Sequence, residues 1–249
     1  MEFLKKLRML NANGLKFLAA VLMVIDHVGF MFFPNQLLFR YVGRLSMPLF
    51  AFAISEGCRY TKNKTRHFLL IFCLAVICQV VYYFFDNGSL YMCILVTFSV
   101  SILVIYAMQF FKKSLFENAS IAKKLFAGGL FLGSIVGAFL LNRILTIDYG
   151  FWGCMTPVFA SIFDFHRIPA PDKVKKLDIL PLRALCLFLA LALVAIDFLP
   201  STLAFYALGA LPLLLLYNGE KGKWSTKYFF YLFYPLHLVL LEGIYILLS

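Results

Sequence analysis

Apolar segments of about 20 residues recur along the whole chain, and few folds can accommodate them. Each is long enough to cross the ~30 Å hydrocarbon core of a bilayer as a helix. Hydrophobic residues make up 63% of the 249 residues and charged residues only 14%, which is more apolar surface than a water-soluble fold can bury. The sequence therefore predicts an all-α, polytopic (multi-pass) protein of the cell's plasma membrane, with residues 1–249 forming a single transmembrane domain.

About nine membrane-spanning helices are predicted from these segments. They cover residues 15–33, 42–60, 67–85, 90–111, 125–142, 149–164, 182–199, 201–218 and 228–248. The segment 149–164 is the shortest and contains Pro157, which interrupts helical hydrogen bonding. We predict a short span there, with a re-entrant course as the alternative.

The distribution of basic residues predicts the topology. Of the 23 Lys and Arg residues, all except Arg40, Arg44 and Arg143 fall on one side of the predicted spans. Because cytoplasmic loops are rich in Lys and Arg, we expect a cytoplasmic N-terminus and a C-terminus outside. The net charge of +11 then reflects topology, with membrane lipid as a partner, and it gives no reason to expect nucleic acid.

The first predicted span carries the ionisable pair Asp26-His27 in its interior. Such groups are costly in hydrocarbon, so they have either a functional role or hydrogen bonds that join helices. His27 lies past the midplane on the same helical face as Lys16, whereas Asp26 points about 100° away. Asp26 and His27 therefore cannot pair with each other, and each needs a partner on another helix.

The second predicted span places Arg44 and Ser46 near the outer end and Glu56 and Arg59 near the cytoplasmic end. We expect Arg44 either to anchor the helix at the interface or to reach Asp26 or a substrate anion. Glu56 and Arg59 are spaced i, i+3, which favours an ion pair between them.

The last predicted span holds His237 near its middle, with Tyr234 on the same side and Pro235 between them. A histidine at this depth indicates function more strongly than interfacial tyrosines do. The six cysteines are isolated and are expected to be small buried hydrophobes. No cluster of ligand residues predicts a metal site.

Three blocks of the sequence resemble the TraX family, which is named for the acetylase of conjugative pilin. The blocks are 15–29, 43–57 and 233–237, and the stretch 148–153 is also similar. More distantly, Lys16, ten residues and His27 are similar to the Arg, ten residues and His of acyltransferase-3 membrane proteins, with Lys replacing Arg. Heparan-glucosaminide acetyltransferase belongs to the same broad grouping and uses cytoplasmic acetyl-CoA.

This resemblance implies an acetyl-CoA-dependent N- or O-acyltransferase. His27 would act as base or acetyl carrier, and Asp26 would orient a neighbouring hydrogen-bond donor or balance Arg44. Arg44 or a freed backbone group would stabilise the oxyanion. His237 would hold the acceptor or serve as a second base. The predicted substrate- and cofactor-binding residues are Lys16, Arg44, Ser46, Glu56, Arg59, Tyr234 and His237.

The acceptor and the assembly state stay open at this point. A pilin-like protein N-terminus, a glycan or a small molecule outside the cytoplasm would each serve as acceptor, and a homodimer is possible. One alternative is a proton-coupled small-molecule transporter that uses Asp26, His27, His237 and Glu242 as relay groups. A second alternative is a non-enzymatic component of a secretion or pilus machine.

Overall fold

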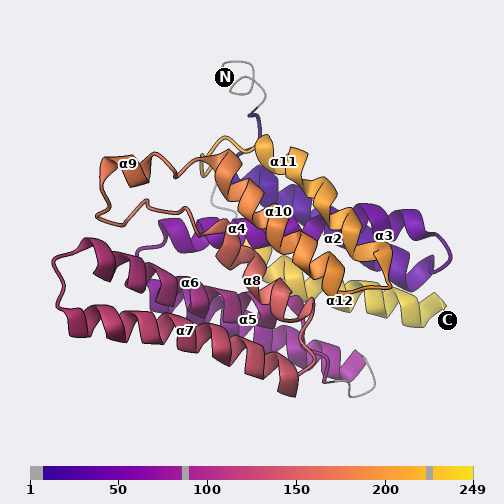
Figure 1. Cartoon of the computed structure of the whole chain (residues 1–249). Helices are drawn as coiled ribbons and strands as arrows, with labels where there is room; N and C mark the ends of the chain where they lie inside the picture. The colour runs from indigo at the N-terminus through magenta and orange to yellow at the C-terminus, as the bar shows by residue number, and fades with distance from the viewer. Residues whose placement is uncertain (1–7, 86–89, 223–226, 249) are drawn as a thin grey trace. The chain divides into compact units, whose positions relative to one another are not determined.

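The computed structural model describes residues 8–85, 90–222 and 227–248, and these residues are predominantly helical (Figure 1). The helices are α2 (Ala12–Phe32), α3 (Leu37–Gly43), α4 (Ser46–Tyr60), α5 (Lys64–Phe85), α6 (Ile94–Phe116), α7 (Ile121–Ile144), α8 (Gly150–Ala160), α9 (Asp172–Lys175), α10 (Leu180–Asp197), the 3-10 helix η1 (Thr202–Ala210), α11 (Leu211–Leu215) and α12 (Lys227–Leu248). Within these ranges, extended backbone pairs only in two isolated bridges, Leu10 with Tyr217 and Met92 with Ile147.

Seven of the described helices are long and apolar enough to cross a membrane. They are Ala12–Phe32, Leu37–Tyr60 (α3 and α4 together), Lys64–Phe84, Ile94–Phe116, Ile121–Ile144, Leu180–Asp197 and Phe229–Leu248. The prediction of an all-α multi-pass membrane protein is thus confirmed, but the count of nine spans is not. The predicted spans 149–164 and 201–218 are occupied by shorter helices, α8 in the first and η1 with α11 in the second.

The chain divides into two compact units. The first unit comprises residues 1–53, 77–89 and 191–249, and the second comprises 54–76 and 90–190. Helices α4, α5 and α10 each contribute residues to both units.

In the first unit, α2 and α3 approach closely because glycines face the contact from both helices. A Cβ at Gly29 of α2 would collide with the Cβ of Phe39, and a Cβ at Gly43 of α3 would collide with Asp26. Any other residue at either position would force the two helices apart, so these glycines fix the place of Asp26 relative to α3.

The segment of η1 and α11 runs through the first unit beside α4. Near its start, Tyr206 stacks on Tyr41 of α3 with ring centroids 3.9 Å apart. At its end, Tyr217 packs edge-on against Phe52 of α4, and the neighbouring backbone bonds to Leu10, just before α2. The segment thus contacts α3 near its own start and the residues just before α2 at its end.

In the second unit, α6 packs against α7 and α8 (Figure 1). The Thr97 hydroxyl near the start of α6 donates to the carbonyl of Asp148, just before α8 (2.8 Å). At the other end, the Lys112 ammonium donates to the carbonyl of Ser161, just after α8 (2.9 Å). The chain from 148 to 161 therefore runs along most of α6, even though the 11 helical residues of α8 measure only about 16 Å.

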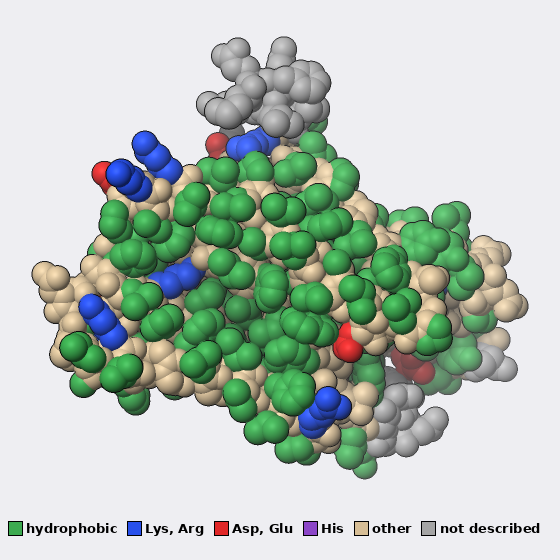
Figure 2. All heavy atoms as spheres, viewed as in Figure 1, with side chains coloured by type: hydrophobic (Ala, Val, Ile, Leu, Met, Phe, Trp, Pro, Cys, Tyr) green, Lys and Arg blue, Asp and Glu red, His purple; other side chains and the backbone are tan. Residues whose placement is uncertain are grey.

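The surface of the long helices is apolar. Hydrophobic side chains cover most of the face visible in Figure 2, with Lys and Arg at a few points. On α7 the exposed side chains include Leu125, Phe126, Leu132, Val136 and Leu140. A surface of this kind suits contact with lipid hydrocarbon.

Candidate functional site

His27 of α2 and His237 of α12 meet in the first unit, although 210 positions separate them in the sequence. Their ring centroids lie 5.3 Å apart, and the rings are nearly perpendicular at 85°. Phe233 stacks in parallel on His237 at 5.0 Å, and Tyr234 meets it edge-on at 5.3 Å. The predicted residues His27, Tyr234 and His237 are thus brought together.

Both imidazoles are held in one tautomer by their own helices. Nδ1 of His27 lies 2.8 Å from the carbonyl of Met23, and Nδ1 of His237 lies 3.1 Å from the carbonyl of Phe233. A carbonyl oxygen only accepts, so each neutral ring carries its proton on Nδ1. The lone pair of each ring is therefore on Nε2, where it can act as a base or a nucleophile.

The Nε2 atom of His237 is buried and has no hydrogen-bond partner among the described residues. The side chain as a whole is only 5% exposed. An unsatisfied buried polar atom costs about 1–3 kcal/mol of stability. Such an atom needs an explanation, and a ligand that donates a hydrogen bond to it is one.

Asp26 forms an ion pair with Arg40 of α3, at 2.9 Å between Oδ2 and Nη1. The predicted pairing of Asp26 with Arg44 is corrected, because Arg40, one helical turn earlier, supplies the ion pair. The Arg40 guanidinium also lies 4.9 Å from the centroid of the Phe30 ring. Sequence analysis missed this role of Arg40, although the four-residue spacing of Arg40 and Arg44 puts both on one helical face.

The Arg40 guanidinium is held close to His27 because it bonds to Asp26, the preceding residue. Its Nη1 lies 2.9 Å from Oδ2 of Asp26 and 3.3 Å from the Asp26 carbonyl oxygen. The outer end predicted for α2 thus combines an imidazole lone pair with a guanidinium group, and Arg44 follows Arg40 by four residues. This combination can stabilise negative charge that develops on a substrate carbonyl.

Lys16 lies in α2 and Ser46 in α4, each in the segment where the sequence predicted a helix. Only Lys16 keeps the position expected of a binding residue. Helix α2 is continuous from Ala12 to Phe32, so Lys16 and His27 share a face at a separation of about 16 Å. Ser46 is buried, and its hydroxyl donates to the carbonyl of Ala19 at 2.7 Å. That hydrogen bond joins α4 to α2, so the hydroxyl proton of Ser46 is used within the protein rather than for binding a substrate.

Glu56 and Arg59 belong to the second unit, and the predicted ion pair between them is wrong. Glu56 Oε1 lies 2.6 Å from Nη1 of Arg183 on α10. Arg59 Nη1 lies 2.9 Å from Asp164 and 2.6 Å from Asp178. Each of the two side chains therefore pairs with residues more than 100 positions away in the sequence instead of with the other.

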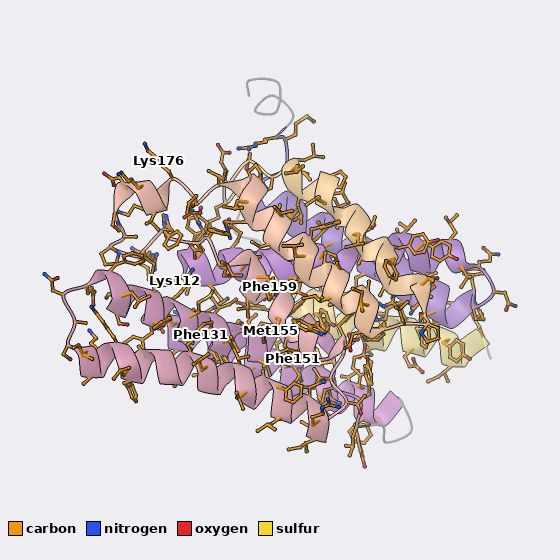
Figure 3. All side chains as sticks on the ribbon, in the orientation of Figure 1. Lys112, Phe131, Phe151, Met155, Phe159 and Lys176 are labelled. Carbon is orange, nitrogen blue, oxygen red and sulfur yellow. The ribbon has the colours of Figure 1, made fainter. Side chains whose placement is uncertain are left out.

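Further hydrogen bonds surround these ion pairs in the second unit. Arg183 donates to the hydroxyl of Ser55 (3.1 Å) and to the carbonyl of Ala160 (3.0 Å). Lys112, labelled in Figure 3 with Met155 and Phe159 of α8, donates to three carbonyls. These are the carbonyls of Ser161 (2.9 Å), Ile162 (2.7 Å) and Asp164 (3.2 Å). These contacts hold helices and loop together, which indicates a structural role, although Nε of Arg59 is buried without a hydrogen-bond partner among the described residues.

The cysteines are unpaired thiols, five of them buried and Cys73 exposed. Burial raises the pKa of the Cys93 thiol, which lies just before α6, and so keeps it protonated and unreactive. Among the residues that the structure describes, no group of three or more His, Cys, Asp or Glu is arranged to hold a metal ion.

Fold and site together define a multi-pass α-helical membrane protein that pairs two histidines between apolar helices. The family model of the TraX protein matches residues 11–245, nearly the whole chain. The chain therefore belongs to the TraX family.

A stretch of 52 residues is 42% identical to an uncharacterised protein of Rickettsia prowazekii (strain Madrid E). The stretch covers 21% of this chain, and the match spans only 21% of the relative's length. No solved structure matches the chain.

Proposed function

We propose that the protein is an integral membrane acetyltransferase of the plasma membrane. It moves an acetyl group from cytoplasmic acetyl-CoA to an amine or hydroxyl acceptor on the outer side. The observation that carries the proposal is the meeting of His27 and His237, with the lone pair of each ring on Nε2. Acyl transfer needs such groups, either as base or as carrier of the acyl group.

The charges around His27 suit this reaction. Attack on a thioester carbonyl places negative charge on its oxygen, and fixed positive charges lower the energy of that state. We assign this role to the guanidinium of Arg40, which the ion pair with Asp26 holds beside α2, with Arg44 as the second candidate. We therefore add Arg40 to the residues predicted from the sequence.

The donor is proposed to lie along α2. Lys16 shares the His27 face and is about 16 Å from it, a distance that the pantetheine arm of acetyl-CoA can cover. We assign a phosphate of the donor to Lys16 and withdraw Arg59 from this role. Arg59 is bonded to two carboxylates, those of Asp164 and Asp178, so these three side chains together carry a net negative charge.

The acceptor follows from the family rather than from the site. The TraX family is associated with pilin acetylation, so a peptide with a free N-terminal amine is the first acceptor to test. A glycan hydroxyl and a small amine are the next. All three present an N–H or O–H group, whose proton an imidazole can take.

The proposal is tested with purified protein in nanodiscs, by measuring acetyl-CoA binding and release of free CoA in the presence of an N-terminal amine peptide. The variants are His27→Ala and, as a matched control, His166→Ala, since His166 is exposed in the second unit. We expect saturable binding, CoA release from wild type and control, and a loss of about 10²–10⁴-fold or more in His27→Ala.

The alternatives predict other results. A transporter would show proton-coupled uptake that depends on His27 without release of CoA. A non-enzymatic pilus component would show neither, and His27→Ala would change only its stability. Failure of a folded wild-type sample to bind acetyl-CoA would contradict the proposed function.

A further inference from the structure

We infer that His237 is a second base with its own task, the removal of the proton from the acceptor. The inference rests on the proposed function and assigns a separate step to each histidine. It starts from the Nε2 atom of His237, which is buried and lacks a hydrogen-bond partner among the described residues.

The orientation of the His237 ring and its tautomer are both fixed by neighbouring groups. The bond from Nδ1 to the carbonyl of Phe233 prevents the ring from turning over without losing a hydrogen bond. The parallel ring of Phe233 and the edge of Tyr234 hold the ring plane. Nε2 can then only accept a hydrogen bond, so the ligand that completes it must bring an N–H or O–H group.

The surroundings of the two histidines differ. His27 directly follows Asp26, which holds the Arg40 guanidinium at 2.9 Å, so a group that can stabilise a negative carbonyl oxygen lies on the His27 side of the pair. His237 is bordered by the aromatic rings of Phe233 and Tyr234 and by His27 itself. His27 is suited to the acetyl carbonyl, and His237 to the incoming acceptor.

With the base role at His237, the lone pair of His27 is available for the acetyl group. Nε2 of His27 attacks the thioester carbonyl, and the C–S bond breaks. The electron pair leaves on the CoA sulfur, which takes a proton from water. The acceptor nitrogen or oxygen then attacks the acetyl carbon while its proton moves to Nε2 of His237. The bond from acetyl to His27 breaks, its electron pair returns to Nε2, and His237 releases its proton to water.

The test compares two acceptors that differ in their need for a base. Both acceptors lose a proton on acylation. The peptide amine is basic and needs a base to take that proton, whereas hydroxylamine is unprotonated and strongly nucleophilic at neutral pH and its adduct loses the proton readily to water. We expect His237→Ala to slow transfer to the peptide by about 10²–10⁴-fold and transfer to hydroxylamine by less than about tenfold. His27→Ala should lose transfer to both acceptors, and His166→Ala should keep both.

Two further measurements separate a base from a packing residue. Added imidazole should restore peptide acetylation by His237→Ala, because it supplies the missing base. His237→Gln preserves much of the side-chain volume without the basic nitrogen, so it should reproduce the peptide defect while the protein stays folded.

Each contrary outcome has its own meaning. Equal losses with peptide and hydroxylamine in both His237 variants would overturn the inference, as would full activity with the peptide. A folded wild-type protein that acetylates neither acceptor would overturn the proposed function and the inference with it.

Discussion

Asp26 receives its counter-charge from Arg40, one helical turn before the arginine that the sequence favoured. Both side chains of the pair are largely buried, at 17% and 18% exposure. Removing one partner therefore leaves the other charge poorly solvated. We expect Arg40→Gln to reduce the free energy of unfolding by about 1–3 kcal/mol and to lower acetyl transfer strongly.

Thermal unfolding in detergent measures the first effect, and a double-mutant cycle identifies its cause. Adding Asp26→Asn to Arg40→Gln removes the isolated carboxylate, so part of the stability should return. If the double variant is as unstable as the sum of the two single variants, the ion pair does not account for the loss.

At the residue scale, the cost of burying charge predicted which residues are candidates for the site, but it did not predict which residues they pair with. Asp26, His27 and His237 were recognisable as candidates because ionisable groups are expensive inside a membrane. The partner of Asp26 was not recognised, because the predicted second span began at residue 42 and left Arg40 outside it. In the structure Arg40 belongs to a helix of its own, α3 (Leu37–Gly43). Likewise, nothing in the spacing of Glu56 and Arg59 points to Arg183, Asp164 or Asp178.

At the scale of single elements, Lys112 controls how α8 ends. Its ammonium is bonded to three carbonyls that follow the helix. Lys112→Met leaves these carbonyls without their donor, so we expect a loss of about 1–3 kcal/mol in unfolding free energy or more. The neighbouring Lys113 is exposed and pairs with Glu117, so Lys113→Met should change stability by less than about 0.5 kcal/mol.

Thermal unfolding of both variants in the same detergent provides the comparison. Equal and small shifts would show that the contacts of Lys112 contribute nothing measurable. A large shift in Lys113→Met would instead indicate that charge at this end of α6, rather than the three carbonyls, matters.

Arg183 connects α10 to α4 through its contacts with Glu56 and Ser55. Because both charged side chains are buried, Arg183→Met should cost about 3–5 kcal/mol by isolating the Glu56 carboxylate. Combining it with Glu56→Gln should recover much of this loss. The readout is the unfolding midpoint of the three variants, and a double variant no better than Arg183→Met would contradict the account.

Helix boundaries depend on features that hydropathy does not register. The segment 149–164 is apolar throughout its interior, yet α8 covers only Gly150–Ala160. Tyr149, just before the helix, and Gly150, its first residue, have positive φ angles, and the chain after Ala160 turns toward Lys112. The same holds for 201–218, where η1 replaces much of the expected α-helix.

At the scale of the whole molecule, the charge distribution makes a topological prediction. The segment 161–179 contains Arg167, Lys173, Lys175 and Lys176, so we expect it on the cytoplasmic side. Within the second unit, Lys112 joins its start to the end of α6 that precedes Lys123. Lys176 and Lys123 should therefore face the same compartment, and Arg143, at the other end of α7, the opposite one.

Labelling of single cysteines tests this arrangement. Lys176→Cys, Lys123→Cys and Arg143→Cys are introduced into a cysteine-free variant and exposed to a membrane-impermeant maleimide on one side of sealed vesicles. We predict that the first two are labelled from the same side and the third from the other. Labelling of Lys176→Cys together with Arg143→Cys would show that residues 148–164 do not cross.

For the whole chain, the length of the apolar segments and the distribution of charge predicted the helical, multi-pass class and the approximate place of seven long helices. They did not predict the division into two compact units, because helices such as α4 and α10 contribute to both. Contacts between distant segments, such as Leu10 with Leu216 or His27 with His237, set that division. Such contacts leave no periodic trace in a single sequence.

The central claim is that acetyl passes from a donor on one side to an acceptor on the other through His27. The most direct measurement uses proteoliposomes with radiolabelled acetyl-CoA outside and an N-terminal amine peptide enclosed. Acetylated peptide should accumulate inside with wild type and His166→Ala and not with His27→Ala. Accumulation that His27→Ala leaves unchanged, or none with folded wild type, would contradict it.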